Sequence, residues 1–105
     1  MLIQINKMKT ESESWKNKDT KLLFEAVLSL KTVEEAGAFF RDLMTPQEIE
    51  TFAERFKVAI LLSKGVPYRE IYEKTGVSTA TVTRVNQWLE RGMGGYKLVL
   101  SKLKI

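Results

Sequence analysis

The stretch from Pro67 to Arg91 constrains the fold of this chain more than any other part of it. It predicts two short helices joined by a tight turn at Gly76, because glycine adopts a left-handed backbone conformation without steric cost. Ser78 is placed to cap the second helix, since its hydroxyl can accept a hydrogen bond from an otherwise unpaired backbone N–H. This spacing is typical of a helix-turn-helix, which places its second helix in the major groove of DNA.

The side chains at the inward-facing positions of this motif support the assignment. If Gly76 occupies the turn, those positions should be apolar, and they hold Ile71, Val77, Val82 and Val85. Tyr72 fits less well, since it lies where close packing of the two helices favours a small side chain. The same spacing also suits an ordinary helical hairpin in an all-α core. The pattern therefore favours DNA binding and leaves that alternative open.

Positive charge is concentrated in the part of the chain that carries the motif. Residues 1–65 hold ten Lys/Arg and ten Asp/Glu, whereas residues 66–105 hold seven basic and three acidic residues. The formal charge of +4 therefore belongs to the second segment. Clustered positive charge is the electrostatic property of surfaces that bind phosphate. A solvated basic face has the same composition, so the charge supports double-stranded DNA as a partner without proving it.

Composition restricts the other classes of function. A chain of 105 residues is expected to form one domain with one modest core. The absence of cysteine and histidine removes disulfides, thiolate metal sites and the commonest proton shuttle. No nucleophile–base pair or metal-ligand set is recognisable, so neither an enzyme nor a resident cofactor is expected. No segment resembles a membrane span or a secretory signal, which predicts a cytoplasmic protein without a membrane partner.

The first half of the chain predicts two helices after an irregular tail. Residues 1–18 are polar and expected to be mobile, and Met8 is a second candidate start, so residues 1–7 need not be native. The folded DNA-binding and dimerisation domain is expected to span residues 19–105. A first helix carries an apolar face of Leu22, Leu23, Ala26, Val27 and Leu30. A capping box of Thr32 and Glu35 opens a second helix, whose buried face would hold Ala36, Phe39, Phe40 and Leu43.

A third helix has the clearest boundaries in the sequence. Thr45 is its predicted cap, Pro46 its first residue and Glu48 the partner in a capping box, and the helix should end at Gly65. Residues 58–62 are apolar on nearly every side of this helix, which requires burial on all sides. Residues 96–105, after a glycine-rich break, form a last short helix with many aliphatic residues. Both features predict contact with a second subunit, and hence a homodimer.

Several segments of the chain resemble one known family. The chain resembles the Trp repressor family, and more closely its YerC/YecD-type branch, in five segments: residues 43–49, 54–57, 61–65, 69–71 and 80–84. The resemblance covers roughly residues 19–105. It implies an all-α chain of about six helices that forms an intertwined homodimer and reads DNA with its helix-turn-helix. It also implies a transcription regulator, typically a repressor.

Helical geometry divides the candidate DNA-binding residues into two groups. Those at the N-terminal end of the second motif helix would face the groove floor, where small side chains suit thymine methyls or water-mediated contacts: Ser78, Thr79 and Ala80. Others are better placed to bind phosphates: Arg69, Lys74, Thr81 and Thr83. Arg69 could instead reach a guanine. Arg84 could pair with DNA phosphate or another anion.

The resemblance also implies an effector pocket. In the family's repressor, tryptophan lies between two arginines that match Arg55 and Arg84, near a threonine that matches Thr45. The glycine that leaves room for the indole is Val85 in this chain, and Trp88 replaces a serine. These larger side chains should fill the space, so tryptophan is not expected to act as corepressor, while an unidentified small-molecule effector is left open. Two interpretations of Trp88 remain open: it occupies the pocket, or it is a core aromatic on the inner face of its helix.

Two other classes of function compete with DNA regulation. A helix-turn-helix can serve as a protein-docking module, and a small-molecule sensor of the transcription machinery can act without DNA. The second motif helix is rich in hydroxyls and has no acid before Glu90. Protein interfaces favour aromatic anchors instead. A sensor that does not bind DNA would leave the charge of residues 66–105 unexplained.

Overall fold

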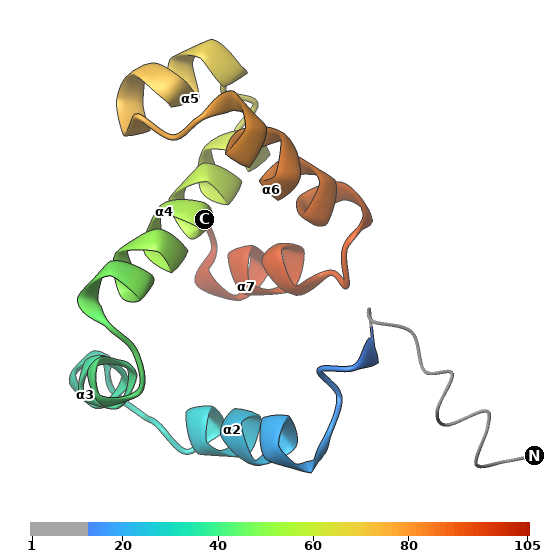
Figure 1. Cartoon of the computed structure of the whole chain (residues 1–105). Helices are drawn as coiled ribbons and strands as arrows, with labels where there is room; N and C mark the ends of the chain where they lie inside the picture. The colour runs from blue at the N-terminus through green and yellow to red at the C-terminus, as the bar shows by residue number, and fades with distance from the viewer. Residues whose placement is uncertain (1–12) are drawn as a thin grey trace, which may run out of the picture. The chain divides into compact units, whose positions relative to one another are not determined.

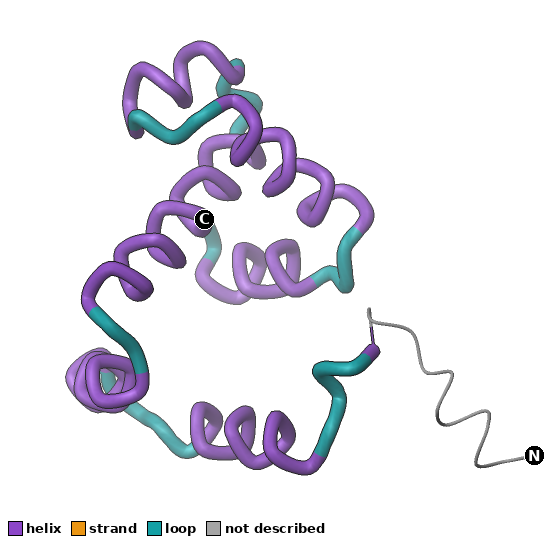
Figure 2. Tube along the Cα trace, in the orientation of Figure 1, coloured by secondary structure: helices purple, strands orange, loops and turns teal. Residues whose placement is uncertain are grey.

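The computed structural model describes residues 13–105, and every regular element in that range is helical (Figures 1 and 2). The expectations about Met8 and about most of the tail therefore lie outside the described residues. The six described helices are α2 (Lys18–Leu28), α3 (Val33–Leu43), α4 (Pro46–Ser63), α5 (Tyr68–Thr75), α6 (Thr79–Arg91) and α7 (Gly95–Leu103). The all-α prediction is confirmed for this range. The chain divides between Leu43 and Met44 into two compact units, which we call the first and the second unit.

In the first unit, α2 begins with a capping box that was not anticipated. The Asn17 side chain accepts a hydrogen bond from the Thr20 N–H at 2.9 Å, and the Thr20 hydroxyl accepts one from the Asn17 N–H at 3.0 Å. The Trp15 ring meets the Phe24 ring edge-on, with 6.1 Å between their centroids. The helix ends at Leu28, so Leu30 lies beyond the helical face to which the sequence pattern assigned it.

The predicted cap of α3 is half correct. The Thr32 hydroxyl accepts a hydrogen bond from the Glu35 N–H at 3.0 Å, as a capping box requires. The Glu35 carboxylate, however, accepts from the N–H of Lys31 at 3.0 Å rather than from that of Thr32. It therefore reaches one residue further back along the chain and ties the loop to the helix start.

Neither α2 nor α3 contains a buried residue in the single chain. The prediction of a buried face on α3 is wrong for the single chain, because Ala36, Phe39 and Phe40 are only half-buried and Leu43 is exposed. Leu22 on α2 is 66% exposed. An apolar helical face needs a second layer to cover it, and residues 13–43 of the first unit do not supply one.

In the second unit, α4 begins as its sequence predicts. The Thr45 hydroxyl accepts from the Glu48 N–H at 3.2 Å, and a Glu48 carboxylate oxygen accepts from the Thr45 N–H at 2.9 Å. The hydrogen bonds from the Thr45 backbone and side chain lower the pKa of Glu48, because they favour the charged carboxylate. Pro46 is the first helical residue, and Gly65, with φ of +78°, follows the last turn.

The core of the second unit forms where α4 contacts α5, α6 and α7. Val58 and Ala59 are completely buried, whereas residues 60–62 are half-buried, so the predicted burial on all sides is met only in part within one chain. The Phe56 and Tyr96 rings stack at 6.5 Å and join α7 to α4. Leu100 of α7 is buried. The other large aliphatics of this end stay exposed: Leu98, Val99, Leu103 and Ile105. No helix in residues 13–105 is long and apolar enough to span a membrane.

Candidate nucleic-acid interface

The turn between α5 and α6 adopts the conformation that its glycine predicts. Gly76 has φ of +72°, and its N–H donates to the Tyr72 carbonyl at 2.8 Å to close α5. Thr75 stabilises both sides of the turn, which the sequence analysis did not anticipate. Its hydroxyl donates to the Ile71 carbonyl at 2.7 Å and accepts from the Val77 N–H at 3.1 Å. The turn is therefore held by both backbone and side-chain hydrogen bonds.

The inner faces of α5 and α6 pack as predicted. The four inward positions form one cluster with Val58 and Ala59 of α4, and all are buried: Ile71, Val77, Val82 and Val85. Tyr72 does not disturb this packing, because its side chain points away from the core and is 54% exposed. Figure 1 shows α6 (orange) crossing the C-terminal half of α4 (green), with α5 (yellow) beside it. The motif thus rests on the most deeply buried part of α4.

Ser78 caps α6 and is bonded to Thr81. The Ser78 hydroxyl accepts from the Thr81 N–H at 3.2 Å and donates to the Thr81 hydroxyl at 3.1 Å. Both hydroxyls thus stabilise the first turn of the helix. Thr79, Ala80 and Thr83 are exposed on its outer face. The exposed surface near the N-terminal end of α6 therefore presents short side chains, which allows a close approach to a partner there.

The two basic residues of α5 are paired within their own helix. The Arg69 Nε lies 3.5 Å from Glu73 Oε1, and the Lys74 Nζ lies 3.5 Å from Glu70 Oε1. Both pairs are four residues apart and exposed. Arg84 on α6 is exposed and makes no ion pair in the described part of the chain. The predicted phosphate-binding cations are thus accessible, but two of them already have acidic neighbours.

The predicted effector residues are not joined to one another. No hydrogen bond or ion pair links any two of the five within residues 13–105: Thr45, Arg55, Arg84, Val85 and Trp88. The guanidinium carbon of Arg55 lies 5.3 Å from the Phe52 ring centroid, and the Thr45 hydroxyl caps α4. Val85 is completely buried. An open hollow on α6 is lined by other residues, namely Asn86, Gln87, Glu90 and Arg91.

Trp88 is 47% exposed, so its interpretation as a core aromatic is wrong for the single chain. The inner face of α6 is formed by Val82, Val85 and Leu89. Trp88 is next to Leu89 in the sequence, and a neighbour on a helix points about 100° away, here out of the core. Its other interpretation, as the side chain that occupies the effector pocket, stays a prediction.

Comparison with known proteins gives consistent matches. The family described as "Trp repressor protein" matches residues 18–104. The "Uncharacterized protein YerC" of Bacillus subtilis (strain 168) is 42% identical over 89 residues, which cover 85% of this chain and 86% of that protein. A TrpR-like protein from Eubacterium eligens ATCC 27750 is 43% identical with a TM-score of 0.85, covering 89% of this chain and 96% of that structure. A putative Trp repressor from Staphylococcus aureus is 34% identical, also with a TM-score of 0.85. The match covers 92% of this chain and 97% of that structure.

Proposed function

Because this chain belongs to the Trp repressor family, in the branch of the YerC protein, we propose that it is a sequence-specific DNA-binding regulator of transcription. The geometry of α5, the Gly76 turn and α6 carries the proposal. The apolar side of this motif is buried against α4, and the exposed side of α6 presents short side chains near its N-terminal end. In a helix-turn-helix, the second helix uses such a face in the major groove.

We assign two roles to the proposed DNA-binding residues, and the hydrogen bonds and exposure of α6 support the division. Thr79 and Ala80 approach base edges, since both are exposed in the first turn of α6. Ser78 and Thr81 hold the N-terminus of that helix in place through their mutual hydrogen bonds. The remaining residues of the set bind phosphates and orient the motif: Arg69, Lys74, Thr83 and Arg84.

We propose that the active form is a homodimer, and that it acts as a repressor, the role typical of the family. The first unit leaves its apolar faces uncovered in the single chain, and α7 exposes Leu98 and Leu103. A partner subunit would remove these surfaces from water. Two motifs related by a two-fold axis would then bind half-sites about one DNA turn apart.

We further propose that tryptophan is not the corepressor. The Val85 side chain occupies space inside the core, and the Arg55 guanidinium lies against Phe52. A free indole would have to displace well-packed atoms to enter beside Val85. Titration calorimetry with L-tryptophan should show no binding, and a micromolar dissociation constant would overturn this part of the proposal.

The deciding experiment selects random duplex DNA with the purified protein, without added ligand, and sequences the retained DNA. A two-fold symmetric site should be enriched. An Ala80→Leu variant should enrich a different sequence, because it changes the surface at the groove floor. A Gln87→Ala variant, altered on the same helix outside the proposed contacts, should enrich the wild-type site. No enrichment, with or without a metabolite extract, would refute a DNA-binding function.

Two exposed aromatics favour a second candidate function, a protein-docking module. Tyr72 and Trp88 lie on the two helices of the motif with about half of each side chain exposed. Aromatic side chains are common anchors at protein interfaces. Under this alternative, a Trp88→Ser variant would lose a protein partner while the selection above gave no DNA site. Under the DNA-binding proposal, the same variant would still enrich a site.

A further inference from the structure

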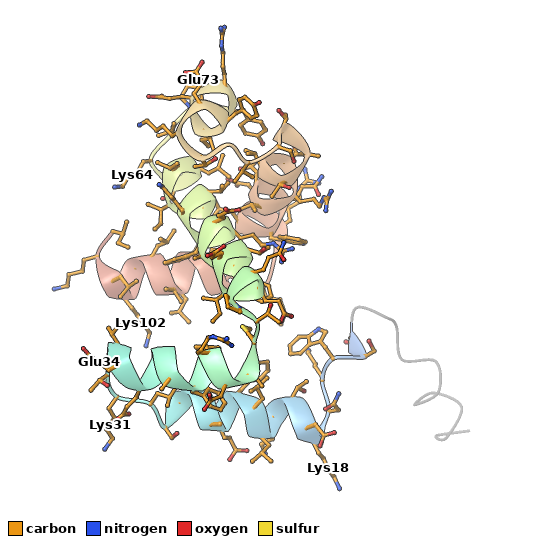
Figure 3. All side chains as sticks on the ribbon, turned by 60° about the vertical axis from the view of Figure 1, so that its left-hand side comes forward. Lys18, Lys31, Glu34, Lys64, Glu73 and Lys102 are labelled. Carbon is orange, nitrogen blue, oxygen red and sulfur yellow. The ribbon has the colours of Figure 1, made fainter. Side chains whose placement is uncertain are left out.

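The exposed side of α5 carries as much negative as positive charge. Arg69 is paired with Glu73 and Lys74 with Glu70, each at 3.5 Å. All four side chains are about half exposed or more, from 48% for Glu70 to 92% for Arg69. Figure 3 shows Glu73 on the outer side of α5. A ligand that approaches this helix would therefore meet two carboxylates together with the two cations.

Most of the positive charge of the second unit lies outside the motif. Residues 68–91 contain four basic and three acidic side chains, which gives a formal charge of only +1. Residues 92–105 contain no acid and three lysines: Lys97, Lys102 and Lys104. Affinity for DNA of any sequence comes largely from cations that replace counterions on phosphates. The helix pair that would dock on DNA is thus poor in the charge that gives such affinity.

Resting on the proposed function, we propose that Glu70 and Glu73 compete with DNA phosphates for Lys74 and Arg69, and thereby set the DNA affinity of the motif. The first helix of a helix-turn-helix lies across the phosphate backbone. Exposed ion pairs are weak, so phosphates can displace the carboxylates. After displacement, each carboxylate remains close to a phosphate of like charge. The resulting penalty applies to every sequence, because all duplex DNA has the same backbone.

Weakening of the phosphate contacts has a functional consequence. Base contacts from α6 must then supply a larger share of the binding free energy. A duplex that offers few base contacts falls below the affinity needed for occupancy. Glu70 and Glu73 would therefore suppress binding to arbitrary DNA without touching any base.

The test measures dissociation constants for two duplexes, the selected site and a scrambled sequence, at several salt concentrations. The Glu73→Gln variant should bind both duplexes more tightly, by about fivefold at low salt. Its plot of log K against log salt concentration should steepen by about one unit for each freed cation. Glu70→Gln should behave in the same way through Lys74. The ratio between the two duplexes should stay unchanged in both variants.

Glu90→Gln is the matched control. It removes the same charge from the exposed C-terminal part of α6, where Glu90 makes no ion pair in the described residues. It should bind within about twofold of the wild type, because its distance from the α5 cations weakens the effect through screening. Circular dichroism would verify that all three variants fold.

The outcomes separate this inference from the function on which it rests. If the wild type binds the selected site but Glu73→Gln and Glu70→Gln match Glu90→Gln, the carboxylates do not compete with phosphate. A change confined to the selected site would also overturn the inference, since a backbone effect is independent of sequence. Absence of duplex binding by the wild type at every salt concentration would refute the proposed function, and this inference with it.

Discussion

The two units of the chain use the same local devices but reach different degrees of burial. Each contains helices opened by side-chain caps, at Asn17 and Thr32 in the first unit and at Thr45 and Ser78 in the second. All buried hydrophobic residues in the described range nevertheless belong to the second unit. A cap and an amphipathic pattern therefore determine where a helix lies, whereas burial depends on how many other helices surround it.

The arrangement of the second unit explains this contrast. There α4 contacts three other helices, and short branched side chains fill the space between them. Within the described residues the first unit has two helices, α2 and α3, and large apolar residues such as Leu28 and Val33 remain exposed. We infer that its stability depends on a cover from outside the unit.

The largest expected effect is the loss of core packing in the motif. Ile71→Ala should lower the free energy of unfolding by about 2–5 kcal/mol, because it leaves a cavity at a completely buried position. Urea unfolding followed by circular dichroism would measure it. Leu22→Ala is the counterpart in α2, where the side chain is largely exposed. A similar loss in both variants would mean that α2 is covered as completely as the motif, and would remove the contrast.

Next in size is the effect of a charge on the first unit. If a partner subunit covers α2, Leu22→Asp should weaken the dimer by about 100-fold, since it would bury a carboxylate without a partner. Light scattering over a dilution series would follow the change. Lys21→Asp, a charge change at the neighbouring position, should weaken the dimer far less. Unchanged dissociation of the Leu22→Asp variant would show that this face is not the interface.

Glycine-to-alanine changes should have opposite signs in the two units. Gly76→Ala should cost about 1–2 kcal/mol, because its φ of +72° is strained for any residue with a Cβ atom. Gly37→Ala in α3 should stabilise the protein by about 0.5–1 kcal/mol, since alanine favours helix and no atom beyond the adjacent helical backbone lies within 4 Å of the added carbon. Thermal unfolding would compare them. Destabilisation by Gly37→Ala would indicate that another chain occupies this space.

The smallest effect concerns acid stability at the start of α4. The pKa of Glu48 is lowered in the folded state. The stability that its carboxylate contributes is therefore fully present above the pKa of the unfolded state, and it is lost as the pH falls through the lower pKa of the folded state. Glu48→Gln should therefore lose less stability than the wild type on acidification below about pH 4.3. Unfolding at several pH values would test this. Glu50→Gln is the control, because within residues 13–105 the Glu50 carboxylate accepts no hydrogen bond, and this variant should follow the wild type.

Features set by neighbours in the sequence could be predicted from residues alone. Gly76, Ser78 and Thr45 act on groups within four residues of themselves, and the structure places each as expected. The ion pairs of α5 were equally accessible to prediction, because Arg69 and Glu73 have the spacing that brings side chains together on a helix.

Features that depend on distant packing could not be predicted in the same way. Periodicity identified the apolar face of α3, but it does not show what covers Phe39 or Phe40. The exposure of Trp88 depends on the rotation of α6 about its axis, which the contacts with α4 determine. The effector residues also come from different elements, and their roles remain predictions.

The positions of the indoles give each unit its own optical reporter. The chain has two tryptophans, Trp15 against Phe24 in the first unit and Trp88 on the outer part of α6. In a Trp15→Phe variant, all indole fluorescence would come from α6. Since Trp88 is partly exposed to water, its emission wavelength should shift when a ligand, a partner chain or DNA covers it. The first unit can be observed separately through Trp15 in a Trp88→Phe variant.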